Sequence, residues 1–167
     1  MGMKQAGGFT IIESVVSLGV LGVLATLLLT ASVNARRNTV ARIGAEQFAG
    51  FLRETATFAV NGVKDQSCPV ALTDPTCSRY TVAPVAGEAA YTRQSVAGGT
   101  VVRRSLPQGA RFGTASDVTF SYTPPTLDVV GSRTVEVTHV SGAPIWRVCV
   151  LSNETVEVRS PVDPVCA

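Results

Sequence analysis

The sequence predicts an α+β protein in which one long N-terminal helix packs on an antiparallel, β-rich head. Two observations lead to this fold class. No charged residue stands between Glu13 and Arg36, so residues 14–35 form an unbroken uncharged run. An amphipathic helical pattern follows, and beyond about residue 63 the 167-residue chain shows only short strand-like segments separated by turn residues.

The uncharged run is long enough to cross a membrane. As a helix, residues 14–35 would extend about 33 Å, and the hydrocarbon layer of a bilayer is about 30 Å thick. A helix suits lipid because it satisfies its backbone hydrogen bonds internally. We therefore expect a transmembrane segment over about residues 9–35. Glu13 lies at its start, where burying a carboxylate requires a compensating partner.

The helix is expected to continue past the membrane segment, over about residues 36–60. Its apolar positions recur at steps of three and four residues, which is typical of an amphipathic helix. Asn61-Gly62 is a favourable helix end, so we place the whole helix and its stop within residues 9–62. The stripe expected to pack under a sheet comprises Val40, Ile43, Gln47, Phe48, Phe51, Leu52, Thr55 and Phe58.

Residues 63–167 are expected to form the globular head. It begins with a loop over residues 63–79, and Ser152-Asn153-Glu154 reads as the turn of a terminal hairpin. The Pro124-Pro125 and Gly131-Ser132 pairs indicate loops. The expected strands are Tyr80–Val85, Ala89–Val96, Thr100–Leu106, Val118–Tyr122, Arg133–Val140, Ile145–Leu151 and Thr155–Arg159.

The N-terminus carries a short, specific motif. Gly8 is followed by Phe9-Thr10-Ile11-Ile12-Glu13 and then by the uncharged run. This arrangement resembles the class III signal of type IV pilins and type II secretion pseudopilins. The resemblance implies that a prepilin peptidase removes residues 1–8 by cutting between Gly8 and Phe9. It also implies methylation of the Phe9 amine, and a role for Glu13 in assembly through the N-terminal ammonium of a neighbouring subunit.

The order of one long helix followed almost only by strands is most similar to the minor pseudopilins and minor pilins of the GspH/FimT group. Residues 45–56 resemble the post-membrane helix of that group, and Val118-Thr119-Phe120 fits its sheet pattern. The resemblance implies a type IV pilin-like fold and a non-enzymatic filament subunit. Its implied partners are other pilins or pseudopilins, the prepilin peptidase/methyltransferase and an inner-membrane assembly platform.

The implied location is a single pass in the inner membrane with an exported head, and a periplasmic or cell-surface filament after assembly. Two alternatives remain open at this point: an ordinary signal anchor, or a secretory signal cut after the small residues Val33-Asn34-Ala35. The positive-inside rule does not decide, because Lys4 would face the cytoplasm while Arg36 and Arg37 lie on the exported side. The choice between type IV pilus and type II secretion also stays open.

Four cysteines in an exported chain indicate two disulfides. They allow three pairings, and we favour Cys68–Cys77 with Cys149–Cys166. A metal site is not expected, because the sequence has no C-x-x-C motif and one histidine, His139. No catalytic or cofactor-binding motif is recognised, so we expect neither an enzyme nor a cofactor.

A basic patch on the sheet is the remaining hypothesis. It would comprise Arg93, Arg103, Arg104 and Arg111, and it would suit a filament-borne receptor for DNA in natural transformation, or for a secreted substrate. Against DNA, loss of Lys4 with the leader leaves 13 basic and 12 acidic residues (14 − 1 against 12). DNA binding usually needs many phosphate contacts, so we expect a solvated surface instead.

Overall fold

The structure, a computed structural model, describes residues 11–64, 66, 74–123, 126–131, 133–151, 155–163 and 165–166. The chain divides into two compact units, Met1–Arg36 and Arg37–Ala167. The first unit contains the N-terminal part of helix α1 (Ile11–Val60), and the second contains its remainder with the nine described strands. The described chain is thus α+β, with a long N-terminal helix and two antiparallel sheets, as the sequence predicts.

Helix α1 ends where the sequence indicates. Gly62 adopts a φ of 61°, which glycine reaches without steric cost. The Gly62 N–H donates to the Ala59 carbonyl at 3.1 Å, and the Val63 N–H donates to the Phe58 carbonyl at 3.0 Å. This pair of bonds is a Schellman cap, which satisfies carbonyls that would otherwise lack partners at the helix end.

The first sheet has five strands in the order β3-β2-β1-β5-β6, and every neighbouring pair is antiparallel. Residues alternate between a buried face and an outer face, as in β1, where Tyr80 and Val82 are buried between partly exposed neighbours. The strands are β1 (Tyr80–Pro84), β2 (Ala90–Ser95), β3 (Val102–Ser105), β5 (Val118–Thr123) and β6 (Thr126–Gly131).

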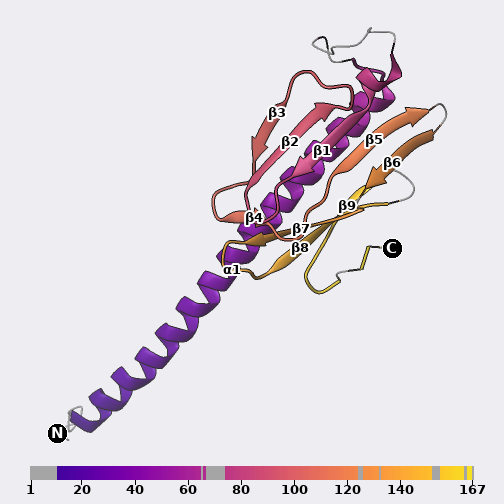
Figure 1. Cartoon of the computed structure of the whole chain (residues 1–167). Helices are drawn as coiled ribbons and strands as arrows, with labels where there is room; N and C mark the ends of the chain where they lie inside the picture. The colour runs from indigo at the N-terminus through magenta and orange to yellow at the C-terminus, as the bar shows by residue number, and fades with distance from the viewer. Residues whose placement is uncertain are drawn as a thin grey trace, which may run out of the picture. The chain divides into compact units, whose positions relative to one another are not determined.

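The second sheet has four antiparallel strands in the order β4-β7-β8-β9. Its last two strands form the terminal hairpin, although the expected turn residues, 152–154, lie outside the described residues. Figure 1 shows the strands of both sheets beside the part of α1 that follows Arg37. The strands are β4 (Ala110–Phe112), β7 (Thr134–His139), β8 (Ile145–Val150) and β9 (Val156–Arg159).

The seven strands expected from the sequence are present, with ends shifted by one or two residues, but β4 and β6 are additional. Strand β4 has three residues, too few for an alternating pattern to stand out. Strand β6 lies between two pairs of turn residues, which by themselves indicate loops. The expected loop over residues 63–79 also contains a short 3-10 helix, η1 (Pro75–Ser78), which Asp74 caps by accepting from the Thr76 N–H at 2.8 Å.

The expected buried stripe of α1 is wrong at two positions. Ile43 is 48% exposed and Gln47 is also exposed, whereas Phe48 and Leu52 are fully buried. The buried face is instead rich in small residues, because both sheets pack closely against this part of the helix. Gly44 shows how closely: a Cβ at this position would lie 3.1 Å from the Ala110 Cβ. The small buried residues are Ala41, Gly44, Ala45, Ala49, Ala56 and Ala59.

Aromatic rings of helix α1 pack against strands of both sheets. Phe48 of α1 makes edge-to-face contacts with Tyr91 of β2 and Phe112 of β4, at centroid distances of 5.2 and 5.0 Å. Phe51 contacts the same tyrosine at 5.0 Å. Such geometry is favourable beyond the burial of apolar area. The core is therefore centred on α1 residues 48–52, where strands from both sheets meet.

Candidate functional site

The N-terminal unit is a helix with an apolar surface. Its large apolar side chains from Ile11 to Val33 are 48% to 85% exposed within the chain. Its hydroxyl groups bond to the helix's own backbone: Thr26 Oγ1 donates to the Val23 carbonyl at 2.8 Å, and Thr30 Oγ1 to the Leu27 carbonyl at 2.9 Å. This is how Ser and Thr are accommodated in lipid. Among the described residues, α1 is long and apolar enough to cross a membrane.

Glu13 lies in the first turn of α1 as described, among exposed apolar side chains. Its backbone carbonyl accepts a hydrogen bond from Ser17 Oγ at 2.7 Å. The proposed cleavage residues, Gly8 and Phe9, lie outside the described residues, as does Lys4. The expected processing site therefore stays a prediction from the sequence. The expected assembly residue, Glu13, lies at the start of the described helix.

The head contains disulfide-bonded cysteines. Cys149 of β8 is bonded to Cys166 near the C-terminus, which is one of the two pairings we favour. Cys77 is also disulfide-bonded. Cys68, its expected partner, lies outside the described residues, so that pairing stays a prediction. The described cysteines therefore have the oxidised state expected of an exported chain.

The four arginines of the hypothetical basic patch do not share one surface. Arg93 is buried on the helix-facing side of β2. Arg103 and Arg104 are adjacent on β3 and pair with Thr92 and Tyr91, so they lie on opposite faces of the first sheet. Arg111 belongs to β4 in the second sheet. The alternation of strand faces separates residues that composition alone would group.

Arg93 is instead part of an internal cluster with the helix. Its side chain is 10% exposed, and its Nη1 donates to Glu54 Oε1 at 3.0 Å. The guanidinium carbon lies 4.4 Å from the Phe58 ring centroid and 5.2 Å from that of Phe51. Cation–π attraction and an ion pair together make such burial tolerable. The sequence carried no signal for this cluster, because its members come from distant segments.

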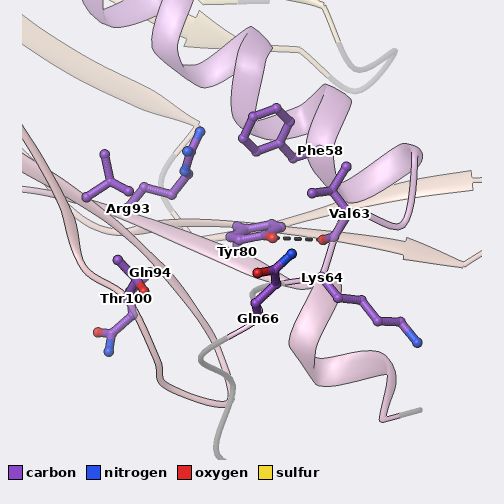
Figure 2. Close-up of a pocket in the computed structure, with 9 residues that line it drawn as sticks. Phe58, Val63, Lys64, Gln66, Tyr80, Arg93, Gln94 and Thr100 are labelled. Atoms are coloured by element: carbon purple, nitrogen blue, oxygen red, sulfur yellow. Dashed lines mark hydrogen bonds between the residues drawn. The ribbon is translucent and has the colours of Figure 1, made fainter. Parts of the chain in front are cut away.

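Figure 2 shows the surroundings of Arg93, where a cavity of about 240 Å³ opens beside Phe58 and Tyr80. Tyr80 Oη donates to the Val63 carbonyl at 2.7 Å, which ties strand β1 to the residue after the helix cap. The Lys64 side chain extends away from the other labelled residues. The cavity thus has one buried cation, and Glu54 already neutralises it.

Comparisons with protein-family models, with curated proteins and with solved structures find no match. The likeness to pilins therefore rests on the N-terminal residues and on the order of elements.

Other candidate groups have structural roles. His139 Nδ1 lies 2.9 Å from Ser141 Oγ in the turn after β7. Trp146 Nε1 donates to Asn38 Oδ1 at 2.8 Å, so the indole links β8 to α1. Within the described ranges, no group of three or more His, Cys, Asp or Glu side chains is placed to hold a metal ion.

The second sheet carries a charged pair on its outer face. Arg147 Nη2 of β8 lies 2.9 Å from Glu136 Oε1 of β7, and Thr114 Oγ1 donates to Glu136 Oε2 at 2.8 Å. Desolvation raises the pKa of Glu136, but the hydrogen bonds from Thr114 and Arg147 and the arginine charge outweigh it, so the pKa lies below its usual value. In the first sheet, burial raises the pKa of the Tyr91 hydroxyl, although the nearby Arg104 opposes this.

Proposed function

We propose that this chain is a minor pilin or pseudopilin, a non-enzymatic subunit of a type IV pilus or a type II secretion pseudopilus. The observation that carries the proposal is the combination of Gly8-Phe9, Glu13 and the uncharged run that follows. The long apolar helix and the antiparallel β-rich head of the described residues are compatible with it. In this proposal a prepilin peptidase cuts after Gly8 and methylates Phe9.

Assembly depends on burying the helix surface from Ile11 to Val33, first in lipid and then among neighbouring subunits. Helices packed without water associate through close contacts and polar pairs. A Cβ placed on Gly19 or Gly22 would meet nothing within 4 Å beyond the adjacent turns of the helix, so both leave room for a neighbour's backbone. The inner-membrane assembly platform would supply the site of transfer from the bilayer to the filament.

Glu13 is the residue proposed to select the register of each new subunit. A carboxylate in a low-dielectric environment costs free energy unless it meets a cation. The N-terminal ammonium of the neighbouring subunit, at methylated Phe9, supplies that cation. The pair forms only when the two helices are in register, so it links assembly geometry to a favourable charge interaction.

The test is Glu13→Val in cells that hold the matching assembly machinery, with Glu46→Val as the matched control. Glu46 lies on the same helix, is exposed and pairs with Arg42 at 2.8 Å, so its loss should cost well under ~1 kcal/mol. Breaking a buried pair at Glu13 costs about 3–5 kcal/mol in the assembled state, because the ammonium loses its partner.

We expect Glu13→Val to insert, to be cleaved and to fold its head, yet to be strongly depleted from sheared filaments. Glu46→Val should enter filaments like the parent chain. If Glu13→Val enters filaments as well as Glu46→Val does, the proposed role of Glu13 is wrong.

A further inference from the structure

A second cavity, of about 350 Å³, lies at the end of the first sheet near its junction with the second. Arg79 immediately precedes Tyr80, which pairs with Phe120, and the next residue on β5, Ser121, pairs with Asp128 of β6. Alternation along the strands therefore brings Arg79, Ser121 and Asp128 to one outer face. Arg133, which follows β6, and Leu151, which follows β8, complete the polar and apolar sides of the cavity.

The charged groups of this cavity are not paired with each other. Arg79 Nε is buried and has no hydrogen-bond partner. Among the described residues, no carboxylate lies within 4.0 Å of the guanidinium of Arg79 or Arg133, and Asp128 takes part in no ion pair. A buried donor without a partner costs free energy, and such a group in a folded protein requires an explanation.

Three other partly buried arginines of the head differ from Arg79 in this respect. Arg93 is paired with Glu54, and Arg147 with Glu136. Arg159 also has a buried Nε without a partner, but its terminal nitrogens hold Glu157 and Asp163. Among the described residues, Arg111 of β4 is also partly buried without a carboxylate within 4.0 Å, so what distinguishes Arg79 and Arg133 is that both line one cavity.

We propose that this cavity, the Arg79–Arg133 site, binds a small oxyanion of the phosphate or carboxylate type. A guanidinium presents several N–H donors in a planar fork that matches such anions. The Ser121 hydroxyl lines the same cavity and can donate a further hydrogen bond. This proposal concerns the head alone and does not depend on filament assembly.

Asp128 provides a second test of the proposal, because it lines the same cavity and its carboxylate would repel a bound anion. The two arginines outnumber it, so the cavity keeps a net positive charge. Removing this repulsion in Asp128→Asn should tighten anion binding about threefold or more. If anions were attracted only by a basic surface without a defined site, Asp128→Asn would change the anion affinity much less.

The experiment uses the full chain in detergent micelles and isothermal titration with inorganic phosphate, at fixed ionic strength set with chloride. We expect saturable binding that Arg79→Gln and Arg133→Gln each weaken about tenfold or more, and that Asp128→Asn strengthens. The matched control is Arg103→Gln, an exposed arginine of the same sheet outside the cavity. It should leave the affinity unchanged.

Acetate, titrated in the same way, distinguishes the two sources of the oxyanion. Tighter binding of acetate would indicate a carboxylate, as on a partner protein, and tighter binding of phosphate would indicate a phosphate group. Circular dichroism identifies a variant that does not fold. In that case the readout is the shift of the Arg79 Nε–H resonance of the parent chain as the anion is added. No saturable binding of either anion, or equal affinity in Arg79→Gln, Arg133→Gln and Arg103→Gln, would overturn the proposal.

Discussion

Arg93 of strand β2 donates a hydrogen bond of 3.0 Å to Glu54 of helix α1, and its guanidinium packs on the rings of Phe51 and Phe58. This contact joins the head's first sheet to the helix through a side chain that is 10% exposed. The partner carboxylate is 48% exposed, so the two residues contribute unequally. Arg93 supplies packing as well as charge, whereas Glu54 supplies mainly charge.

We expect Arg93→Ala to lower the free energy of unfolding by about 2–3 kcal/mol, through lost packing and cation–π contacts. Glu54→Gln should cost about 1 kcal/mol or less, because glutamine still offers an oxygen acceptor. The measurement is denaturant unfolding of the full chain in micelles, followed by the fluorescence of its one tryptophan. Arg103→Ala is the control, within about 0.5 kcal/mol of the parent. Equal effects of Arg93→Ala and Arg103→Ala would contradict this role.

Two glycines of α1 should respond oppositely to alanine. At Gly44 a Cβ would lie 3.1 Å from the Ala110 Cβ and 3.3 Å from Val137 Cγ1, so Gly44→Ala should destabilise the head by about 1–3 kcal/mol. At Gly50 a Cβ would meet nothing within 4 Å beyond the helix itself, so Gly50→Ala should stabilise it by up to about 1 kcal/mol. Thermal unfolding of both variants provides the measurement. A stabilising Gly44→Ala would show that the sheets can move away from the helix.

The Glu136–Arg147 pair should make stability depend on pH below neutrality. The folded-state pKa of Glu136 is lowered from 4.5, so its contribution is present above 4.5 and is lost as the pH falls through the lower folded value. We expect the parent chain to be more stable than Glu136→Gln at about pH 7, and this difference to shrink below pH 4.5. Unfolding of both chains from neutral to acidic pH checks the sign. A difference that grows on acidification would refute the lowered pKa.

The Cys149–Cys166 disulfide closes a loop with a sequence separation of 17 residues. A cross-link over a loop of this size stabilises by about 3 kcal/mol in the chain-entropy model. We expect Cys166→Ser to lower the free energy of unfolding by about that amount, and Cys149→Ser by more, because Cys149 is also fully buried. Alkylation of the untreated chain should label no described cysteine. An unfolding curve that reduction leaves unchanged would exclude a stabilising role for this disulfide.

The sequence predicted the elements better than their packing. The end of α1 at Asn61-Gly62 and the terminal hairpin follow local rules, namely a left-handed glycine and alternating strands. Strand β6 was not predicted, because its pairing with β5 is a tertiary interaction that overrides the loop preference of the flanking turn residues. Ile43 was misplaced because alanines, not large apolar residues, face the closely packed sheets.

For the candidate sites too, local sequence signals were more informative than tertiary arrangement could be. Glu13 was found from a linear motif, since its proposed role depends on position in a helix. The basic patch was the less favoured hypothesis, and the expected solvated surface does not hold for Arg93, which turns toward α1. No local pattern shows which side of β2 faces the helix. The Arg79–Arg133 site joins residues from β5, β6 and the segments that lead into β1 and β7, so only the register of the sheet brings it together.

The most direct test of the proposed filament subunit is the intact mass of the protein recovered from membranes that contain prepilin peptidase. We expect a chain of 159 residues (167 − 8) that begins at Phe9 and carries one methyl group on its amine. Gly8→Val should leave the full-length precursor and stop assembly. A mature chain that begins at Arg36, or an uncut chain in the presence of active peptidase, would contradict the account.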